Sequence, residues 1–363
     1  MEKLKYQQLA DHFRKRIEAG KLHAGEQLPS QQAIQHQFST SQATVERAYT
    51  LLEEEGIIER RWRKGVFVKQ RPVQALTGNI GVIGSPSFEQ VGSLYSTQIM
   101  EGIMAGAAAE SCHALILGND LTLNSGDCRK VDGILIVNVE NMKPLLAKIP
   151  KGMPCVSLLN DTAQISCVKA DNEGGARQAV EYLISRGHRR IAFLKNNNWS
   201  IPVARQKGYE AALRDAGIRP QRSWVRSNNL TGHLSPGDHR LASYEQIRDW
   251  VKEDWRATGC TALLAQNDHL ALGAIRAFTE AGIHVPDEVS IIGFDGTELC
   301  DYFPPRLTSV KIPLTAIGNN AVKVLLQHLR DASKPREVKV LPTSMREGES
   351  VLRRMESLQE SCL

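Results

Sequence analysis

One short stretch of the sequence concentrates cationic side chains that could bind a polyanion. Between Ile57 and Lys69, β-favouring residues alternate with five cations, namely Arg60, Arg61, Arg63, Lys64 and Lys69. Cations that neutralise phosphates release bound counterions, so affinity for such a partner falls as salt rises. Residues 1–71 carry 13 Lys+Arg against 9 Asp+Glu, whereas the remainder carries 32 against 31. The first fifth of the chain is therefore where a polyanion-binding surface is expected.

Two capped helices and a hairpin are predicted to position these cations. Ser30 and Ser41 each precede a helical pattern, and a serine hydroxyl there can accept a hydrogen bond from an unpaired N–H of the first turn. In the second helix, spacings of three and four place four apolar residues on one face: Val45, Ala48, Tyr49 and Leu52. Gly56 is a plausible helix end, and β-favouring runs flank a basic tip at 63–65. This order predicts a winged helix-turn-helix; the alternative is another small α/β module whose charges only solvate its surface.

A winged helix-turn-helix places its second helix in the major groove of DNA, with the N-terminal residues nearest the base edges. The wing tip would reach an adjacent groove or the backbone. One such unit has a small footprint, so a homodimer reading two half-sites is expected, with the helix predicted at 97–110 as a candidate dimer contact. The predicted DNA contacts are Ser30, Gln32, Thr40, Ser41, Gln42, Thr44, Arg47, Arg63, Lys64 and Gly65.

Length and composition predict a soluble globular protein of two or three units. The 363 residues are 42% hydrophobic and 23% charged, which leaves ample material for a core. The seven cysteines show neither a CxxC pair nor zinc spacing, so reduced thiols are expected, with no metal site and no cofactor. The sequence shows no apolar run of about 18 residues and no signal peptide, which predicts a cytoplasmic location.

From Asn79 onward, short apolar runs alternate with helical patterns. The predicted strands are 80–83, 114–117, 131–137, 155–159, 190–194, 262–265 and 289–294. The predicted helices are 97–110, 174–186, 205–216, 244–255 and 270–281. Repeated βαβ units predict a doubly wound α/β architecture of parallel sheets covered on both faces, in which ligands bind beyond the carboxyl ends of the strands. Two halves with a sheet each are expected, with crossings near 159–168 and 299–308.

The N-terminal stretch carries a set of residues that resembles the GntR-type winged-helix domain. These residues are Tyr6, Leu9, Gly25, Leu28-Pro29-Ser30, Thr44-Val45, Leu51-Leu52, Gly56-Ile57 and Gly65-Val66-Phe67-Val68. The sequence departs from the family at Gln32, Gln42 and Glu46, where arginines that contact DNA are common. The operator sequence of a relative therefore cannot be transferred to this chain.

The later part of the chain carries eight phrases in a fixed order: 131–134 (VDGI), 171–175 (DNEGG), 187–193 (GHRRIAF), 205–209 (RQKGY), 267–268 (ND), 282–286 (GIHVP), 292–296 (IGFDG) and 305–310 (PRLTSV). Together they resemble the effector-binding core of LacI/GalR repressors, which is similar to periplasmic sugar-binding proteins. One departure is the short loop between Asn119 and Lys130, where the family usually inserts a helix.

Together the resemblances imply an arabinose-repressor-type plan. The winged helix would span 1–71, a linker 72–78 and the effector domain 79–355. The effector domain would divide into one subdomain at 79–166 and 299–327 and another at 167–298 and 328–355. The implied function is sugar-responsive control of transcription, as a repressor of a carbohydrate-utilisation operon. Enzyme signatures such as GxSxG, Walker A and HExxH are absent, so no enzyme activity is expected.

The resemblance also implies a sugar bound between the two subdomains. A neutral polyol needs planar donors, carboxylate acceptors and an aromatic face. Arg205 offers a rigid fork of donors and matches the family's ligand-contacting arginine, while Asp295 at a strand end can accept from two hydroxyls. The remaining candidates are Asn267, Asp268, Ser85, Phe88, Tyr95, Lys169 and Trp199. Structural roles are the alternative; Asn267, for example, could simply cap a helix.

Proteins with other functions have a core of the same kind. A sugar-binding component of transport or chemoreception would need export, and an enzyme would turn over the bound sugar. Within the regulator interpretation, an activator and a corepressor-dependent factor stay open. The identity of the sugar is open as well, and Lys169 and Lys195 allow a phosphorylated one.

Overall fold

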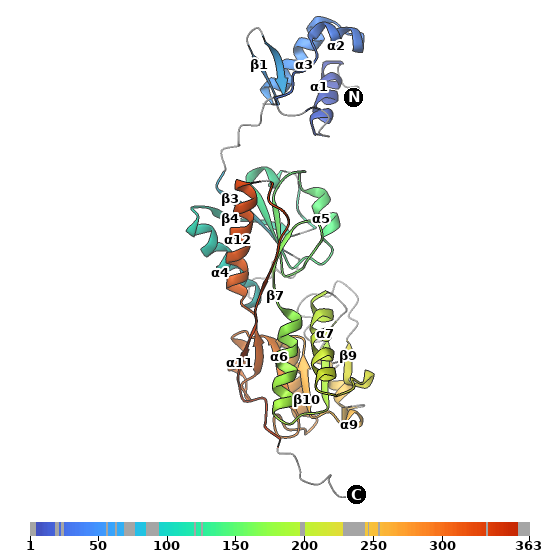
Figure 1. Ribbon diagram of the computed structural model, residues 1–363, viewed down its shortest axis with the longest axis vertical. Helices are drawn as coiled ribbons and strands as arrows, with labels where there is room; N and C mark the ends of the chain where they lie inside the picture. Colours follow the sequence, from blue (N-terminus) through green and yellow to red (C-terminus); the bar gives the residue numbers. More distant parts are fainter. Residues whose placement is uncertain are drawn as a thin grey trace, which may run out of the picture. The chain divides into compact units, whose positions relative to one another are not determined.

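The computed structural model describes residues 5–18, 22, 25–55, 57–61, 64–68, 77–84, 94–119, 121–124, 126–196, 200–227, 244–245, 247–252, 255–331 and 333–354. The chain divides into two compact units, Met1–Thr77 and Gly78–Leu363 (Figure 1). Among the described residues, no helix is both long enough and apolar enough to cross a bilayer.

The first unit is a winged helix-turn-helix, as predicted. It comprises three helices and an antiparallel hairpin: α1 (Lys5–Glu18), α2 (Gln31–Phe38), α3 (Gln42–Glu54), β1 (Ile58–Arg61) and β2 (Gly65–Val68). The apolar stripe of α3 is buried together with Phe13 of α1 and Ile34 of α2. Both predicted caps are present, because Ser30 Oγ accepts from Ala33 N at 3.2 Å and Ser41 Oγ accepts from Thr44 N at 3.3 Å.

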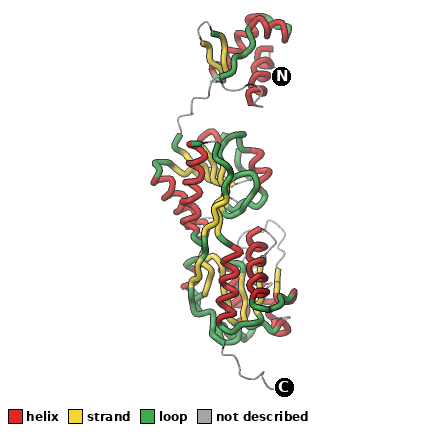
Figure 2. The backbone as a smooth tube through the Cα atoms, in the orientation of Figure 1, coloured by secondary structure: helices red, strands yellow, loops and turns green. Residues whose placement is uncertain are grey.

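The second unit contains two six-stranded sheets, each the centre of one lobe (Figure 2). The first lobe has the strand order β13-β7-β6-β5-β3-β4, formed by β3 (Asn79–Gly84), β4 (His113–Asn119), β5 (Gly133–Val137), β6 (Cys155–Leu158), β7 (Ser166–Ala170) and β13 (Val338–Leu341). All neighbouring strands in this sheet are parallel. Its helices are α4 (Leu94–Ala109), α5 (Met142–Lys148), α12 (Leu314–Arg330) and the short η1 (Asp127–Lys130).

The second lobe has the strand order β14-β12-β11-β10-β8-β9. Its strands are β8 (Ile191–Lys195), β9 (Val225–Ser227), β10 (Ala262–Ala265), β11 (Ser290–Asp295), β12 (Thr308–Lys311) and β14 (Ser344–Arg346), of which only β14 runs antiparallel to its neighbour. The helices are α6 (Asn172–Ser185), α7 (Ser200–Asp215), η2 (Arg222–Trp224), α9 (Trp255–Thr258), α10 (Asp268–Glu280) and α11 (Leu299–Tyr302). The predicted helix at 244–255 lies partly outside the described residues.

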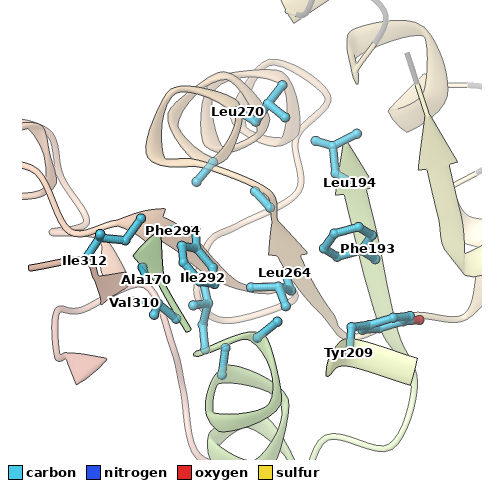
Figure 3. Packing of buried hydrophobic residues seen from close by; sticks show 14 of the residues in the cluster. Ala170, Phe193, Leu194, Tyr209, Leu264, Leu270, Ile292, Phe294, Val310 and Ile312 are labelled. Atoms are coloured by element: carbon cyan, nitrogen blue, oxygen red, sulfur yellow. The ribbon is translucent and has the colours of Figure 1, made fainter. Parts of the chain in front are cut away.

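The predicted doubly wound architecture is confirmed, because both sheets consist mainly of parallel strands and their central strands are buried on both faces. In β8 and β10 every residue is buried, as a parallel strand covered on two sides requires. Figure 3 shows how Phe193, Leu264, Ile292 and Phe294 of adjacent strands pack in this core. Tyr209 of α7 stacks on Phe193 with ring centroids 5.3 Å apart.

The chain crosses between the lobes three times, and each crossing lies later than the predicted subdomain bounds imply. β7 still belongs to the first sheet and β12 to the second, so the crossings follow Ala170 and Lys311, and a third lies between β13 and β14. The physical reason is strand pairing: β7 continues beside β6, and β12 continues beside β11, up to their carboxyl ends. Hydrogen bonds to a neighbouring strand are not visible in a local pattern.

Glycines allow close helix contacts in each lobe. A Cβ at Gly102 of α4 would lie 2.0 Å from the carbonyl oxygen of Thr315 in α12, and one at Gly208 of α7 would lie 2.0 Å from that of Glu173 in α6. Both distances are far shorter than any tolerated contact, and the obstructing atoms belong to backbone. These two helix pairs can therefore pack this closely only with glycine.

Candidate functional site

In the first unit, the two serine caps position the N-terminal turn of α3. Ser41 Oγ also lies 3.0 Å from Thr44 Oγ1, so both hydroxyls are held at the start of this helix. The side chains of Gln42 and Arg47 are exposed, as is that of Gln32 on α2, whereas Thr40 and Thr44 are half-buried. Ser30 serves as the cap of α2.

The hairpin has a tight turn that Gly65 makes possible. Its φ is +111°, a conformation that favours glycine, and Gln27 Nε2 donates to the carbonyl oxygen of Lys64 at 2.9 Å. Lys64 is exposed at this turn. Arg61 stacks over the ring of Phe67 at 4.6 Å. The predicted contact Arg63 lies outside the described residues.

In the second unit, Arg205 of α7 is the centre of a buried polar cluster. Its side chain is only 4% exposed. Nε donates to Asn172 Oδ1 at 2.9 Å, Nη1 donates to the carbonyl oxygen of Gln266, and Nη2 lies 3.3 Å from Asp295 Oδ1. The guanidinium carbon lies 3.6 Å from the ring centroid of Phe294. Each nitrogen of this fork therefore makes one hydrogen bond, and one N–H group on each of Nη1 and Nη2 is left for a ligand.

Asp295 ends β11 with a φ of +112°, unusual for a residue with a side chain. Burial raises the pKa of its carboxyl group to about 8; Arg205 opposes this rise and Asp268 adds to it. The side chain of Asp295 is 12% exposed. A carboxyl group whose pKa lies near neutral pH is typical of a functional site.

We expect this raised pKa to appear in the pH dependence of stability. An aspartate in an unfolded chain has a pKa of about 3.9. The protonated Asp295 side chain therefore contributes fully to the free energy of unfolding below about pH 4, and this contribution is lost as pH rises through about 8. From pH 6 to 8 the thermal midpoint of the native protein should fall relative to that of Asp295→Asn, and above pH 8 the two curves should run parallel. Curves that are parallel throughout would contradict the raised pKa.

Tyr95, near the start of α4, brings the first lobe to this cluster. Burial raises the pKa of its hydroxyl, and the charges of Asp295 and Arg205 act on it in opposite directions. These two charges can act on the Tyr95 hydroxyl through space only because the fold brings the three groups into one neighbourhood. The structure thus brings together three of the predicted effector contacts, one from the first lobe and two from the second.

Other predicted effector contacts have structural partners. Asp268 is 1% exposed and accepts from Thr297 N at 2.8 Å, from Thr297 Oγ1 at 2.9 Å and from Ser309 Oγ at 2.5 Å. Asn267 Oδ1 caps α10 by accepting from Leu270 N at 2.9 Å. Lys169 pairs with Asp161 at 3.1 Å. Ser85, Phe88 and Trp199 lie outside the described residues.

A second polar group that the sequence did not indicate joins the two lobes. Glu140, after β5 of the first lobe, accepts from Ser200 N at 2.8 Å and from Ser200 Oγ at 2.9 Å at the start of α7. Asn160, after β6, donates from Nδ2 to Glu140 at 2.7 Å and to Ser200 Oγ at 3.2 Å. We call these three residues the cross-lobe bridge. Each follows a strand, and this position is the signal that could have identified them.

The cap supplied by Glu140 explains why α7 begins at Ser200, five residues before the predicted start. A carboxylate stabilises a helix N-terminus because it accepts from free N–H groups and opposes the helix dipole. Here it comes from the other lobe, 60 residues away. Asn160 Oδ1 is buried without a hydrogen-bond partner, which is costly unless a further donor is supplied. Among the described residues, no cluster of three or more metal-binding side chains is found.

Comparison with known proteins identifies both units. Residues 5–68 match the model of the bacterial regulatory proteins of the gntR family, and residues 180–351 match that of a periplasmic binding protein-like domain. The chain thus joins a GntR-type helix-turn-helix domain to a periplasmic-binding-protein-like core. The predicted combination of domains is confirmed.

The chain is also similar to known regulatory proteins. The chain is 31% identical over 217 residues to the HTH-type transcriptional repressor PurR of Vibrio atlanticus. This alignment covers 58% of this chain and 61% of that protein. It is 28% identical over 280 residues to catabolite control protein A of Priestia megaterium, covering 73% and 79%.

Two solved structures extend this likeness to the fold. The CelR–cellobiose complex aligns with a TM-score of 0.67 at 23% identity, covering 86% of this chain and 91% of that one. A LacI family transcriptional regulator from Enterococcus faecium with bound ribose aligns with a TM-score of 0.63 at 26% identity, covering 76% and 100%.

Proposed function

We propose that this protein is a sugar-responsive transcription regulator that represses a carbohydrate-utilisation operon. Its first unit would bind operator DNA, and its second unit would bind a sugar or sugar derivative between the two lobes. The observation that carries this proposal is the presence in one chain of a GntR-type DNA-binding domain and of the Arg205 cluster beside the cross-lobe bridge. A protein with this DNA-binding role would act in the cytoplasm.

The geometry supports a neutral polyol as the effector class. Tyr95, Arg205 and Asp295 would contact its hydroxyls, and the unpartnered Asn160 Oδ1 would accept from one more. Lys169 is neutralised by Asp161, which argues against its use as a phosphate ligand. Asn267 and Asp268 would stabilise the structure around the site through their own hydrogen bonds, and Ser85, Phe88 and Trp199 stay predicted contacts. The ribose bound by the Enterococcus faecium regulator belongs to the same chemical class.

Sugar binding would act on DNA affinity by changing how the lobes meet. The cross-lobe bridge is the contact that such a motion would tighten or break, because its hydrogen bonds join residues of both lobes. In a homodimer, with α4 as the candidate contact, this change would alter the spacing of the two winged helices. Coupling of this kind is typically about 1–3 kcal/mol and acts equally in both directions.

The test combines two measurements on the full chain. Thermal unfolding against a panel of neutral sugars, sugar acids and sugar phosphates should show a raised midpoint for a neutral sugar, since a ligand specific for the folded state stabilises it. The same sugar should change affinity for an operator duplex by about 5- to 150-fold. A midpoint shift without any salt-dependent DNA binding would favour the sugar receptor instead, and turnover of the sugar would favour an enzyme.

A further inference from the structure

The exposed face of α3 carries a carboxylate where a DNA-binding helix would be expected to carry neutral or cationic groups. Glu46 lies four residues after Gln42 and therefore on the same face of the helix, one turn from its N-terminus. Its side chain is 44% exposed. A carboxylate facing the phosphates of DNA is repelled unless a cation neutralises it, so the contacts of Glu46 show how such a group could be tolerated.

Two neighbouring elements hold this carboxylate. Arg60 Nη1 of β1 pairs with Glu46 Oε1, and Gln31 Nε2 of α2 donates to Oε2 at 2.6 Å. The hydrogen bond from Arg60 lowers the pKa of Glu46 most, and burial partly opposes it. Glu46 is thus ionised and oriented from both sides. Each of its oxygens can still accept a second hydrogen bond.

Arg60 makes all of these contacts with side chains of α3. Besides Glu46, its Nε lies 2.9 Å from Glu53 Oε2, and its Nη2 donates to Thr50 Oγ1 at 3.3 Å. The guanidinium therefore offsets the negative charge of Glu46 at close range, while its donors are occupied by three side chains of one helix. This leaves a neutralised carboxylate with free acceptor capacity on the face of α3 that would enter the groove.

The major groove offers few partners to an acceptor. Only the N4 amine of cytosine and the N6 amine of adenine donate there, and adenine places the acceptor N7 beside its amine, where it would oppose the carboxylate. Building on the function proposed above, we propose that Glu46 is a specificity-determining residue that accepts a hydrogen bond from the N4 amine of one cytosine in each half-site. Arg60 and Gln31 orient the carboxylate for this contact.

The experiment selects binding sequences for the full chain from a randomised duplex pool and then measures affinity for the selected site with each base at every position. The native protein should prefer cytosine at one position per half-site by about 5- to 150-fold, the discrimination of a good base contact. Glu46→Gln should shift that preference to adenine, since an amide can pair with both N6 and N7. Glu46→Ala should remove the preference at that position and leave the others unchanged.

Glu53→Gln is the matched control, because it removes the same charge from the same Arg60 network two turns further along α3. It should retain the cytosine preference. The inference is overturned if the native protein, Glu46→Gln and Glu46→Ala all select the same sequence and the two variants bind every sequence more tightly by the same factor. Glu46 would then act only as a repulsive charge. If the native protein enriches no sequence and shows no salt-dependent binding, the proposed DNA-binding function itself fails.

Discussion

Arg205→Ala is expected to destabilise the second unit by at least about 3 kcal/mol and to abolish the stabilisation by sugar. Three buried acceptors would lose their donor together: Asn172 Oδ1, the carbonyl oxygen of Gln266 and Asp295 Oδ1. Each buried group left unsatisfied costs about 1–3 kcal/mol. The measurement is chemical unfolding of the variant, followed by thermal unfolding with the effective sugar.

Two further measurements test this prediction: the pH dependence of the stability lost in Arg205→Ala, and the stability of a double variant. Above about pH 8 the native carboxylate of Asp295 is charged and paired, so the deficit of Arg205→Ala should grow there. Arg205→Ala combined with Asp295→Ala should cost less than the sum of the two single variants, because they share one contact. A deficit below about 1 kcal/mol at pH 7 would show that the cluster is not tightly formed.

Gly208→Ala is expected to weaken both the fold and sugar binding, although Gly208 itself touches no sugar in the proposed site. The new Cβ would meet the carbonyl oxygen of Glu173 at 2.0 Å, so α7 would have to move away from α6. Overpacking of this kind costs about 1–3 kcal/mol. Because Arg205 lies one turn before Gly208 and bonds to Asn172 beside Glu173, the same movement would lengthen the Arg205–Asn172 hydrogen bond.

Lys207→Ala is the control for this second prediction, since Lys207 is exposed on the same helix. It should leave both the unfolding free energy and the sugar-induced shift unchanged. The argument fails if Gly208→Ala loses stability but binds the sugar with native affinity. In that case the close contact between α6 and α7 would serve the fold alone and would not position Arg205.

Local patterns predicted the elements well where the controlling contacts are local. Ser30 and Ser41 cap their helices within three residues, and the stripe of Val45, Ala48, Tyr49 and Leu52 is buried as its spacing requires. Element ends were less accurate where the partner is distant. The start of α7 depends on Glu140 of the other lobe, and β7 and β12, which were not predicted as strands, depend on pairing with neighbouring strands.

The same distinction holds for the candidate effector site. Arg205 and Asp295 could be selected by residue type, strand position and family resemblance. The sequence did not reveal that Asp268 is engaged by Ser309 and Thr297, which lie 41 and 29 residues away along the chain. Nor did it single out Asn172 and Gln266, whose roles appear only when α6, α7 and β10 are packed together.

The sequence by itself determined the two kinds of domain, because helix caps, apolar periodicity and charge distribution act over a few residues and are readable in order. Only the tertiary structure decided which polar groups meet. The cross-lobe bridge and the Glu46–Arg60 pair join residues 60 and 14 positions apart along the chain. Such pairings depend on where sheets and helices pack in space, and hydrogen bonds form only between groups that folding has brought within about 3 Å of each other.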